Sequence, residues 1–267
     1  HEKLNDVQSP DPLFETYEYY GTIKSHKETV GRISRLTKKA EVKEGVRPKG
    51  IFPIVINIDS LKIDSKIILE DLHLSFEEGR KYKLTGPSGC GKTTLFRVLT
   101  GEITDFEGSV TLGGVEIKDI NSNYLKSKIA YIEQRPHLFQ LSIRDNITML
   151  NDRVDENKLE EVLTDKYMRE IIENKTDKYL IDEEGSNLSG GEKMRVALSR
   201  LFLKDCDIIL SDESTANLDK AAAVSVEEAL LNSGKTLVMI THNNLYDISG
   251  YDAIINMTPP AANECKA

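Results

Sequence analysis

The sequence predicts an α/β fold in which a parallel sheet carries an inserted helical block. Two short apolar runs, residues 208–210 and 237–240, are typical of parallel strands that are buried on both faces. A third short strand, residues 82–85, runs into a glycine-rich loop, and a helix is expected over residues 92 to about 99. A largely helical stretch follows from about residue 142 to 203. Strands that alternate with helices indicate an α/β sheet with a helical subdomain.

The first 50 residues differ in pattern from the rest of the chain. Apolar residues recur at helical spacing between Tyr17 and Leu36, with Lys and Arg between them. Pro48 then lies in a stretch that breaks any helix. We therefore expect residues 1–50 to form a helical lead-in and linker, and residues 51–267 to form the main domain.

Two stretches near the start of the main domain predict strands. Isoleucines alternate with other residues over 54–58, and apolar and polar residues alternate over 72–76. Residues 110–117 read as a hairpin whose turn is Gly113-Gly114. These stretches therefore add further strands ahead of and after the glycine-rich loop.

Composition places the chain among globular proteins and argues against nucleic acid as a main partner. Of the 267 residues, 39% are hydrophobic and 30% are charged, and the net charge is -9. Basic residues are dense over 24–49, which fits either a solvated helix face or a contact with an anionic membrane surface. The three cysteines, Cys90, Cys206 and Cys265, have no disulfide or metal spacing, so a reducing compartment is expected.

No apolar run approaches the length that spans a bilayer, and the polar start at His1 does not resemble a secretory signal. We expect any action on a membrane to depend on another segment or subunit. The start at His1 also suggests an excised or processed fragment.

The glycine-rich loop carries the clearest chemical signal. Residues 86–93 match the pattern G-x-x-x-x-G-K-[ST] at every fixed position. In this pattern backbone N–H groups surround phosphate oxygens, Lys92 reaches the terminal phosphates and the Thr93 hydroxyl ligates Mg²⁺. The candidate phosphate-binding residues are Gly86, Pro87, Ser88, Gly89, Cys90, Gly91, Lys92, Thr93 and Thr94.

The apolar run 208–210 ends in two carboxylates. Asp212 is placed to hold Mg²⁺ through water, and Glu213 is placed to polarise an attacking water. Alone, the same pattern also describes a core strand that ends in two solvated acids. The phosphate-binding pattern upstream favours the catalytic interpretation.

A second candidate phosphate site lies at residues 188–192, Leu-Ser-Gly-Gly-Glu. A serine hydroxyl and two glycines at a helix start can form a nest of N–H groups. Ser189 and Glu192 also fit a capping box, so a purely structural role remains open at this point. Because one phosphate-binding loop needs one nest, the second suggests a composite site between two chains.

These motifs resemble, in type and order, the nucleotide-binding domain of ABC transporters, and the resemblance runs from about residue 57 to 257. Residues 188–192 match the family signature, Gln134 its Q-loop, residues 216–219 its D-loop and His242 its switch histidine. The resemblance implies a RecA-like P-loop NTPase core with an antiparallel β-subdomain and an inserted helical signature subdomain at about 135–203.

The resemblance also implies roles for single residues. It implies that the catalytic residues are Glu213, His242 and Lys92. It implies that Mg²⁺ is bound by Thr93, Gln134 and Asp212. Nucleotide contacts are expected from Gln134, from Ile63 at the adenine position, and from Ser189, Gly190 and Gly191 of a second chain. The implied activity is ATP hydrolysis at the cytosolic face of a membrane. The implied partners are a second ABC ATPase domain and a transmembrane domain.

Residues 138–147 and 183–187 are similar to exporter segments. Three departures stand against the pattern: Ile63 replaces an adenine-stacking aromatic, Asp182 replaces a usual glycine, and the closing elements after Met257 are expected to be short. A non-transport ABC ATPase that clamps ribosome or DNA is the alternative, and the acidic pI of about 5.2 argues against it. A module that holds ATP without turnover would be expected to lack Glu213 or His242.

Overall fold

The computed structural model describes residues 45–151, 153–241 and 250–260, and it has the predicted α/β class with one antiparallel and one parallel sheet. The predicted lead-in helix lies outside the described residues, and so does His242. No helix in the described ranges is both long and apolar enough to cross a bilayer.

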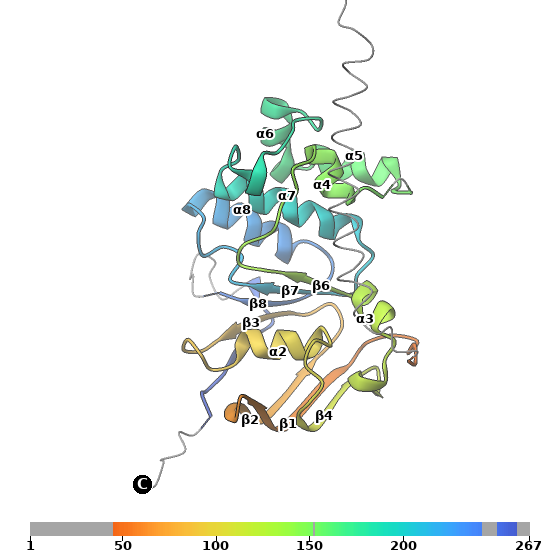
Figure 1. Ribbon diagram of the computed structural model, residues 1–267, viewed down its shortest axis with the longest axis vertical. Coiled ribbons are helices and arrows are strands. Elements are labelled where there is room, and N and C mark those ends of the chain that lie inside the picture. The colour runs from red at the N-terminus through yellow and green to blue at the C-terminus, as the bar shows by residue number, and fades with distance from the viewer. Residues whose placement is uncertain (1–44, 152, 242–249, 261–267) are drawn as a thin grey trace, which may run out of the picture. The chain divides into compact units, whose positions relative to one another are not determined.

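The antiparallel sheet has the strand order β2-β1-β4-β5 (Figure 1). Its strands are β1 (Ile54–Ile63), β2 (Lys66–Phe76), β4 (Glu107–Leu112) and β5 (Val115–Glu116). The predicted alternation is confirmed, because Ile54, Ile56 and Ile58 are fully buried. The predicted Gly-Gly turn joins β4 to β5, and both glycines have positive φ, which glycine adopts without strain.

The parallel sheet has the order β6-β7-β8-β3-β9. Its strands are β3 (Lys81–Thr85), β6 (Ile129–Ile132), β7 (Ile208–Asp212), β8 (Thr236–Ile240) and β9 (Ala253–Asn256). Every residue of β7 and β8 is buried. The two apolar runs are therefore strands covered on both faces, as the sequence predicts.

Alternate residues of the parallel sheet pack into different cores. Val238 and Ile240 join the core shared with α2 (Lys92–Leu99) and the antiparallel sheet. Leu237 and Met239 join the core formed with α7 (Gly190–Leu203) and α8 (Lys220–Leu231). Figure 1 shows α2 between the two sheets and α7 and α8 beyond the parallel sheet.

The largely helical stretch predicted over 142–203 is confirmed and consists of several short helices. They are α4 (Ile143–Thr148), α5 (Glu156–Thr164), α6 (Lys166–Lys175), the 3-10 turn η2 (Glu183–Gly185) and α7. Four of them begin at a polar cap, namely Ser142, Asp155, Asp165 and Ser189, whose side chains accept the first free N–H groups. These helices enclose their own apolar core. Two further short elements, η1 (Ile117–Asp119) and α3 (Ser122–Lys128), lead into β6.

A buried polar cluster joins α8 to the chain entering β9. The Tyr251 hydroxyl donates to Glu227 Oε1 at 2.6 Å, and Lys83 Nζ lies 5.8 Å from the Tyr251 ring centre. Burial raises the pKa of Glu227, although the Tyr251 hydrogen bond and the Lys83 charge oppose this. The folded chain therefore keeps this proton to a higher pH than the unfolded chain. The contribution of protonated Glu227 to the stability of the fold therefore decreases as pH rises above the ordinary Glu pKa.

Tyr251→Phe should lower the free energy of unfolding by about 1–3 kcal/mol, because it leaves Glu227 Oε1 without its donor. Urea unfolding followed by circular dichroism measures the change. Tyr179→Phe is the matched control, since the Tyr179 hydroxyl makes no hydrogen bond within the described ranges and its ring contact with Lys175 is kept. Equal stability of the two variants would contradict a stabilising role for the buried bond.

Candidate nucleotide-binding site

The glycine-rich loop joins the end of β3 to the start of α2. Gly86 has φ 143° and Gly91 has φ 92°, conformations that residues with a Cβ rarely adopt. A Cβ on Gly86 would lie 2.4 Å from the Met257 carbonyl oxygen, and one on Gly91 would lie 2.3 Å from Leu69 Cδ2. Residues of neighbouring segments thus lie too close to the loop to leave room for a Cβ at either position. The loop is shaped as a turn whose N–H groups can face an anion at the start of α2.

The Lys92 side chain folds back over this loop. Its Nζ donates to the carbonyl oxygens of Gly86 at 2.8 Å and Pro87 at 3.0 Å, and the residue is only 7% exposed. Backbone carbonyls hold the ammonium group as neutral acceptors. A phosphate that entered the loop would therefore meet a positive charge already positioned for it.

Asp212 ends β7 next to this loop. It accepts hydrogen bonds from the Thr93 hydroxyl and from the Tyr131 hydroxyl, the latter at 3.2 Å. Burial raises the pKa of Asp212, while these two bonds and the nearby Lys92 charge lower it. Burial and Asp212 together raise the pKa of Tyr131, so this hydroxyl stays a donor. The predicted metal ligands Thr93 and Asp212 are thus in direct contact.

Glu213 follows Asp212 in an unusual backbone conformation. Its φ is 48°, a left-handed value that costs a non-glycine residue roughly 1–3 kcal/mol. Its N–H donates to the Ile240 carbonyl at 3.0 Å, and its Oε2 accepts from Gln134 Nε2 at 3.1 Å. The Q-loop glutamine and the predicted catalytic carboxylate are therefore neighbours.

The signature residues form the start of α7. Ser189 Oγ accepts from the Glu192 N–H at 3.2 Å, and Glu192 Oε2 accepts from the Ser189 N–H at 2.7 Å. The capping box that the sequence left open is therefore present. Ser189 and Gly190 are exposed, and no hydrogen bond in the described part of the chain joins Ser189 to the loop at 86–93.

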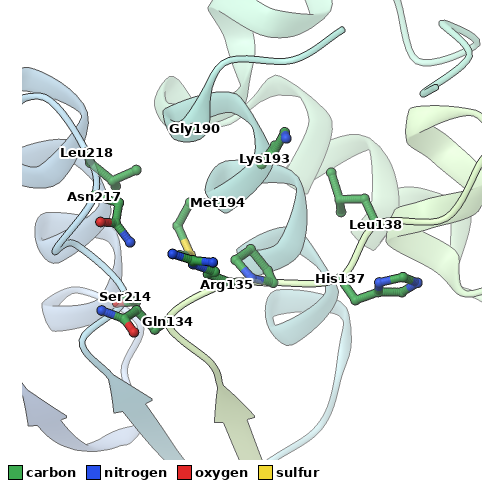
Figure 2. Close-up of a pocket in the computed structure, with 11 residues that line it drawn as sticks. Gln134, Arg135, His137, Leu138, Gly190, Lys193, Met194, Ser214, Asn217 and Leu218 are labelled. Atoms are coloured by element: carbon green, nitrogen blue, oxygen red, sulfur yellow. The ribbon is translucent and has the colours of Figure 1, made fainter. Parts of the chain in front are cut away.

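A cleft of about 470 Å³ lies between the Q-loop, the start of α7 and the segment after Glu213 (Figure 2). It is lined by Gln134, Arg135, Pro136, His137, Leu138, Gly190, Lys193, Met194, Ser214, Asn217 and Leu218. The Q-loop (Gln134), the signature (Gly190) and the D-loop (Asn217 and Leu218) thus all line one cleft.

The structure does not test two further candidate residues, and sequence reasoning missed one contributor. His242 belongs to residues 242–249, which lie outside the described ranges. Ile63 ends β1, is half-buried and packs against the core. Sequence reasoning gave no separate role to Tyr131. The only available signal was its place in the strand before Gln134, because its contact with Asp212 depends on β6 pairing with β7.

The loop, the lysine and the strand-end aspartate define a P-loop nucleotide-binding domain. A family model described as ABC transporter matches residues 69–216, more than half of the chain. The chain belongs to the ABC transporter family and contains its ATP-binding domain.

Curated relatives support the same family. The ABC transporter ATP-binding protein YwjA of Bacillus subtilis (strain 168) is 33% identical over 73% of this chain and 34% of its own length. ABC transporter B family member 14 of Arabidopsis thaliana is 34% identical over 70% of this chain and 15% of its own length. The lactococcin-A transport/processing ATP-binding protein LcnC of Lactococcus lactis subsp. lactis is 32% identical over 66% of this chain and 25% of its own length. The chain spans about a third or less of these relatives.

A solved structure shares the fold. A bacterial Atm1-family ABC exporter with ATP bound superposes with a TM-score of 0.72 at 24% identity, covering 93% of this chain and 46% of the exporter chain. This structural similarity supports the fold of the domain, whereas membership of the family rests on the sequence comparisons.

Lys92→Ala should weaken ATP binding roughly ten- to a hundredfold, because charge-assisted contacts to phosphate contribute about 1.5–3 kcal/mol. Isothermal titration calorimetry with ATP measures the dissociation constant. Lys126→Ala, an exposed lysine in the last turn of α3, is the control and should bind as the unaltered chain does. If Lys92→Ala kept full affinity, the loop at 86–93 would not be the working phosphate site.

Proposed function

We propose that this chain is the ATP-hydrolysing motor domain of an ABC exporter, acting at the cytosolic face of a membrane. The observation that carries the proposal is the arrangement at the end of β7. Asp212 bonds Thr93 of the phosphate loop, while Glu213 beside it bonds Gln134. A metal-holding carboxylate and a water-orienting carboxylate are the two acidic groups that phosphoryl transfer to water requires.

The residues present fit Mg²⁺ bound with ATP. Thr93, Asp212 and Gln134 offer a hydroxyl, a carboxylate and an amide, all hard oxygen donors of the kind Mg²⁺ prefers. When bound, Mg²⁺ would neutralise phosphate charge. The burial that raises the Asp212 pKa disfavours an unpaired carboxylate there, so the same environment favours a nearby cation.

The chain's own groups would divide the remaining work. Lys92, held in place by the Gly86 and Pro87 carbonyls, would bind the terminal phosphates, and the N–H groups of the loop would hold the others. Glu213 orients a water molecule and accepts its proton, and His242 contacts the γ-phosphate. Positioning and electrostatic stabilisation supply the rate enhancement, without a covalent intermediate.

A second ABC ATPase domain would complete the site. Ser189, Gly190 and Gly191 would contact the nucleotide held by the partner's phosphate loop, in a head-to-tail dimer. The exposure of Ser189 supports this, as does the absence of a hydrogen bond from it to residues 86–93 within the described ranges.

A transmembrane domain, fused or separate, would be the third partner. The relatives support an exporter over a clamp on ribosome or DNA: LcnC is a transport/processing protein, and pgp-1 of Caenorhabditis elegans is a multidrug resistance protein. The net charge of -9 argues in the same direction.

Glu213→Gln should keep ATP binding but lower turnover by at least about a hundredfold, because an amide cannot accept the proton from water. With MgATP, size exclusion should then show a stable dimer. Glu133→Gln is the matched control, since Glu133 is an exposed carboxylate next to Gln134. A Glu213→Gln chain that stayed monomeric at saturating ATP, or hydrolysed at the unaltered rate, would refute the assignment.

Ile63 predicts weak selection of the base. No aromatic residue lies between Phe52 and Phe76, and Phe76 is fully buried, so adenine would meet an aliphatic surface. Loss of ring stacking worth about 0.5–1.5 kcal/mol weakens binding roughly two- to tenfold. We expect ATP and GTP to bind alike, and Ile63→Tyr to bind ATP more tightly.

Competition titrations with the two nucleotides test this, with Ile63→Val as the aliphatic control. A preference of the unaltered chain for ATP of more than about thirtyfold would mean that another residue reads the base.

A further inference from the structure

Arg200 of α7 forms a clamp on the chain that follows the Q-loop. Its guanidinium donates to the carbonyl oxygens of His137 at 2.7 Å and Asn146 at 2.9 Å, and to Asn146 Oδ1 at 3.0 Å. It also lies 5.7 Å from the Phe139 ring centre. Within the described ranges Arg200 forms no ion pair, and burial lowers its pKa to about 10.

Asn146 closes the other side of this arrangement. It is fully buried, and its Nδ2 donates to the carbonyl oxygens of Phe139 at 2.9 Å and Ser142 at 3.0 Å. Its Oδ1 accepts from the Phe139 N–H at 2.9 Å. Residues 137–146 therefore form a closed loop whose polar interior is completed by the Arg200 side chain.

Filling the space between α7 and residues 137–146 would not require a charged, hydrogen-bonding side chain such as that of Arg200. A half-buried cation without a carboxylate partner still carries a desolvation cost, and an apolar side chain of similar size would fill the same space without it. A planar guanidinium instead fixes several acceptors at set angles, which makes the contact geometrically specific. The contact thus specifies how residues 137–146 sit against α7.

Both segments line the cleft in Figure 2. Gln134 and Leu138 come from the chain that follows β6, and Gly190 and Met194 come from α7. Arg200 is ten residues after Gly190 on the same helix, about 15 Å along its axis. Since a helix is stiff over this length, a displacement of the Q-loop side reaches the exposed Ser189 through Arg200.

We propose that Arg200 is a positioning residue that makes residues 134–146 and α7 move as one body. Gln134, which bonds Glu213, and Ser189, which would contact the partner's nucleotide, are thereby coupled within one chain. The coupling of ATP hydrolysis to this movement rests on the proposed function, whereas the rigid joining of the two segments does not.

Arg200→Met in the full chain tests the joining by hydrogen exchange. Amides of residues 137–146, above all the Phe139 N–H, should exchange about ten- to a hundredfold faster, while amides of β3 and β8 keep their rates. Arg195→Met is the matched control. Arg195 lies on the same helix but donates to the Tyr167 carbonyl and Glu170, so it joins α7 to α6 instead. In this control residues 137–146 should change by less than about twofold.

Arg200→Lys guards against a variant that fails to fold. A single ammonium keeps the charge but cannot reach all three acceptors, so exchange should lie between those of the unaltered chain and Arg200→Met. Unchanged exchange over 137–146 in a folded Arg200→Met chain would overturn the clamp. Equal acceleration in Arg195→Met would overturn it as well, because it would indicate general loosening.

Steady-state ATPase assays test the consequence for function. Arg200→Met should lower kcat by about tenfold or more while the ATP dissociation constant from calorimetry stays unchanged, because the phosphate loop is not touched. A kcat equal to that of the unaltered chain would overturn the coupling. If the unaltered chain itself does not hydrolyse ATP, the proposed function fails, and the exchange experiment still decides the clamp.

Discussion

Strands β3, β7 and β8 lie side by side in one parallel sheet, and their register decides where the chemistry of this domain can occur. Leu84 of β3 and Asp212 of β7 are both paired with Ile240 of β8. The three strands thus end level at one edge. Each loop leaves its strand at this edge. The phosphate loop and the two carboxylates therefore lie close together in space although they are far apart in sequence. Both faces of the sheet are covered by apolar cores, which makes a slipped register costly.

The charged side chains at this edge of the parallel sheet form hydrogen bonds with uncharged groups. Lys92 rests on two carbonyl oxygens, and Asp212 is bonded by two hydroxyls rather than by a cation. Pairing each charge with an opposite one would satisfy it before any ligand arrived. Neutral hydrogen bonds instead keep the side chains in place while leaving their charges available to phosphate and metal. The strained φ of Glu213 fits the same pattern, because backbone strain gathers at functional sites.

The helical subdomain has its own apolar core, yet it meets the sheet at functional segments. The Q-loop leaves β6 beside Asp212, and α7 contributes to the core under β7 and β8 as well as to the helical core. Arg200 joins these two connections to each other. A change at the phosphate edge therefore has a short physical route to Ser189, whereas the exposed faces of α5 and α6 lie off that route.

The sequence alone determined those features that depend on local spacing. The glycine pattern at 86–93 dictated the turn and the helix that begins at Lys92, and the apolar runs dictated strands β7 and β8. The Gly113-Gly114 turn was equally local. The largely helical stretch predicted at 142–203 is also confirmed, but the turns between its helices depend on how the short segments pack.

Only the tertiary structure decided which side chains touch. Ser189 and Glu192 fitted a cap or a phosphate nest equally well, and the folded chain forms the cap while leaving Ser189 exposed. Local spacing could not predict the contacts of Tyr131, Arg200 and the Glu227–Tyr251 pair, because their partners lie 24 to 81 residues away in sequence. Sequence spacing fixes backbone shape through local sterics and hydrogen bonds. Contacts between distant segments exist only once burial of the apolar cores has set the register and the packing of the elements.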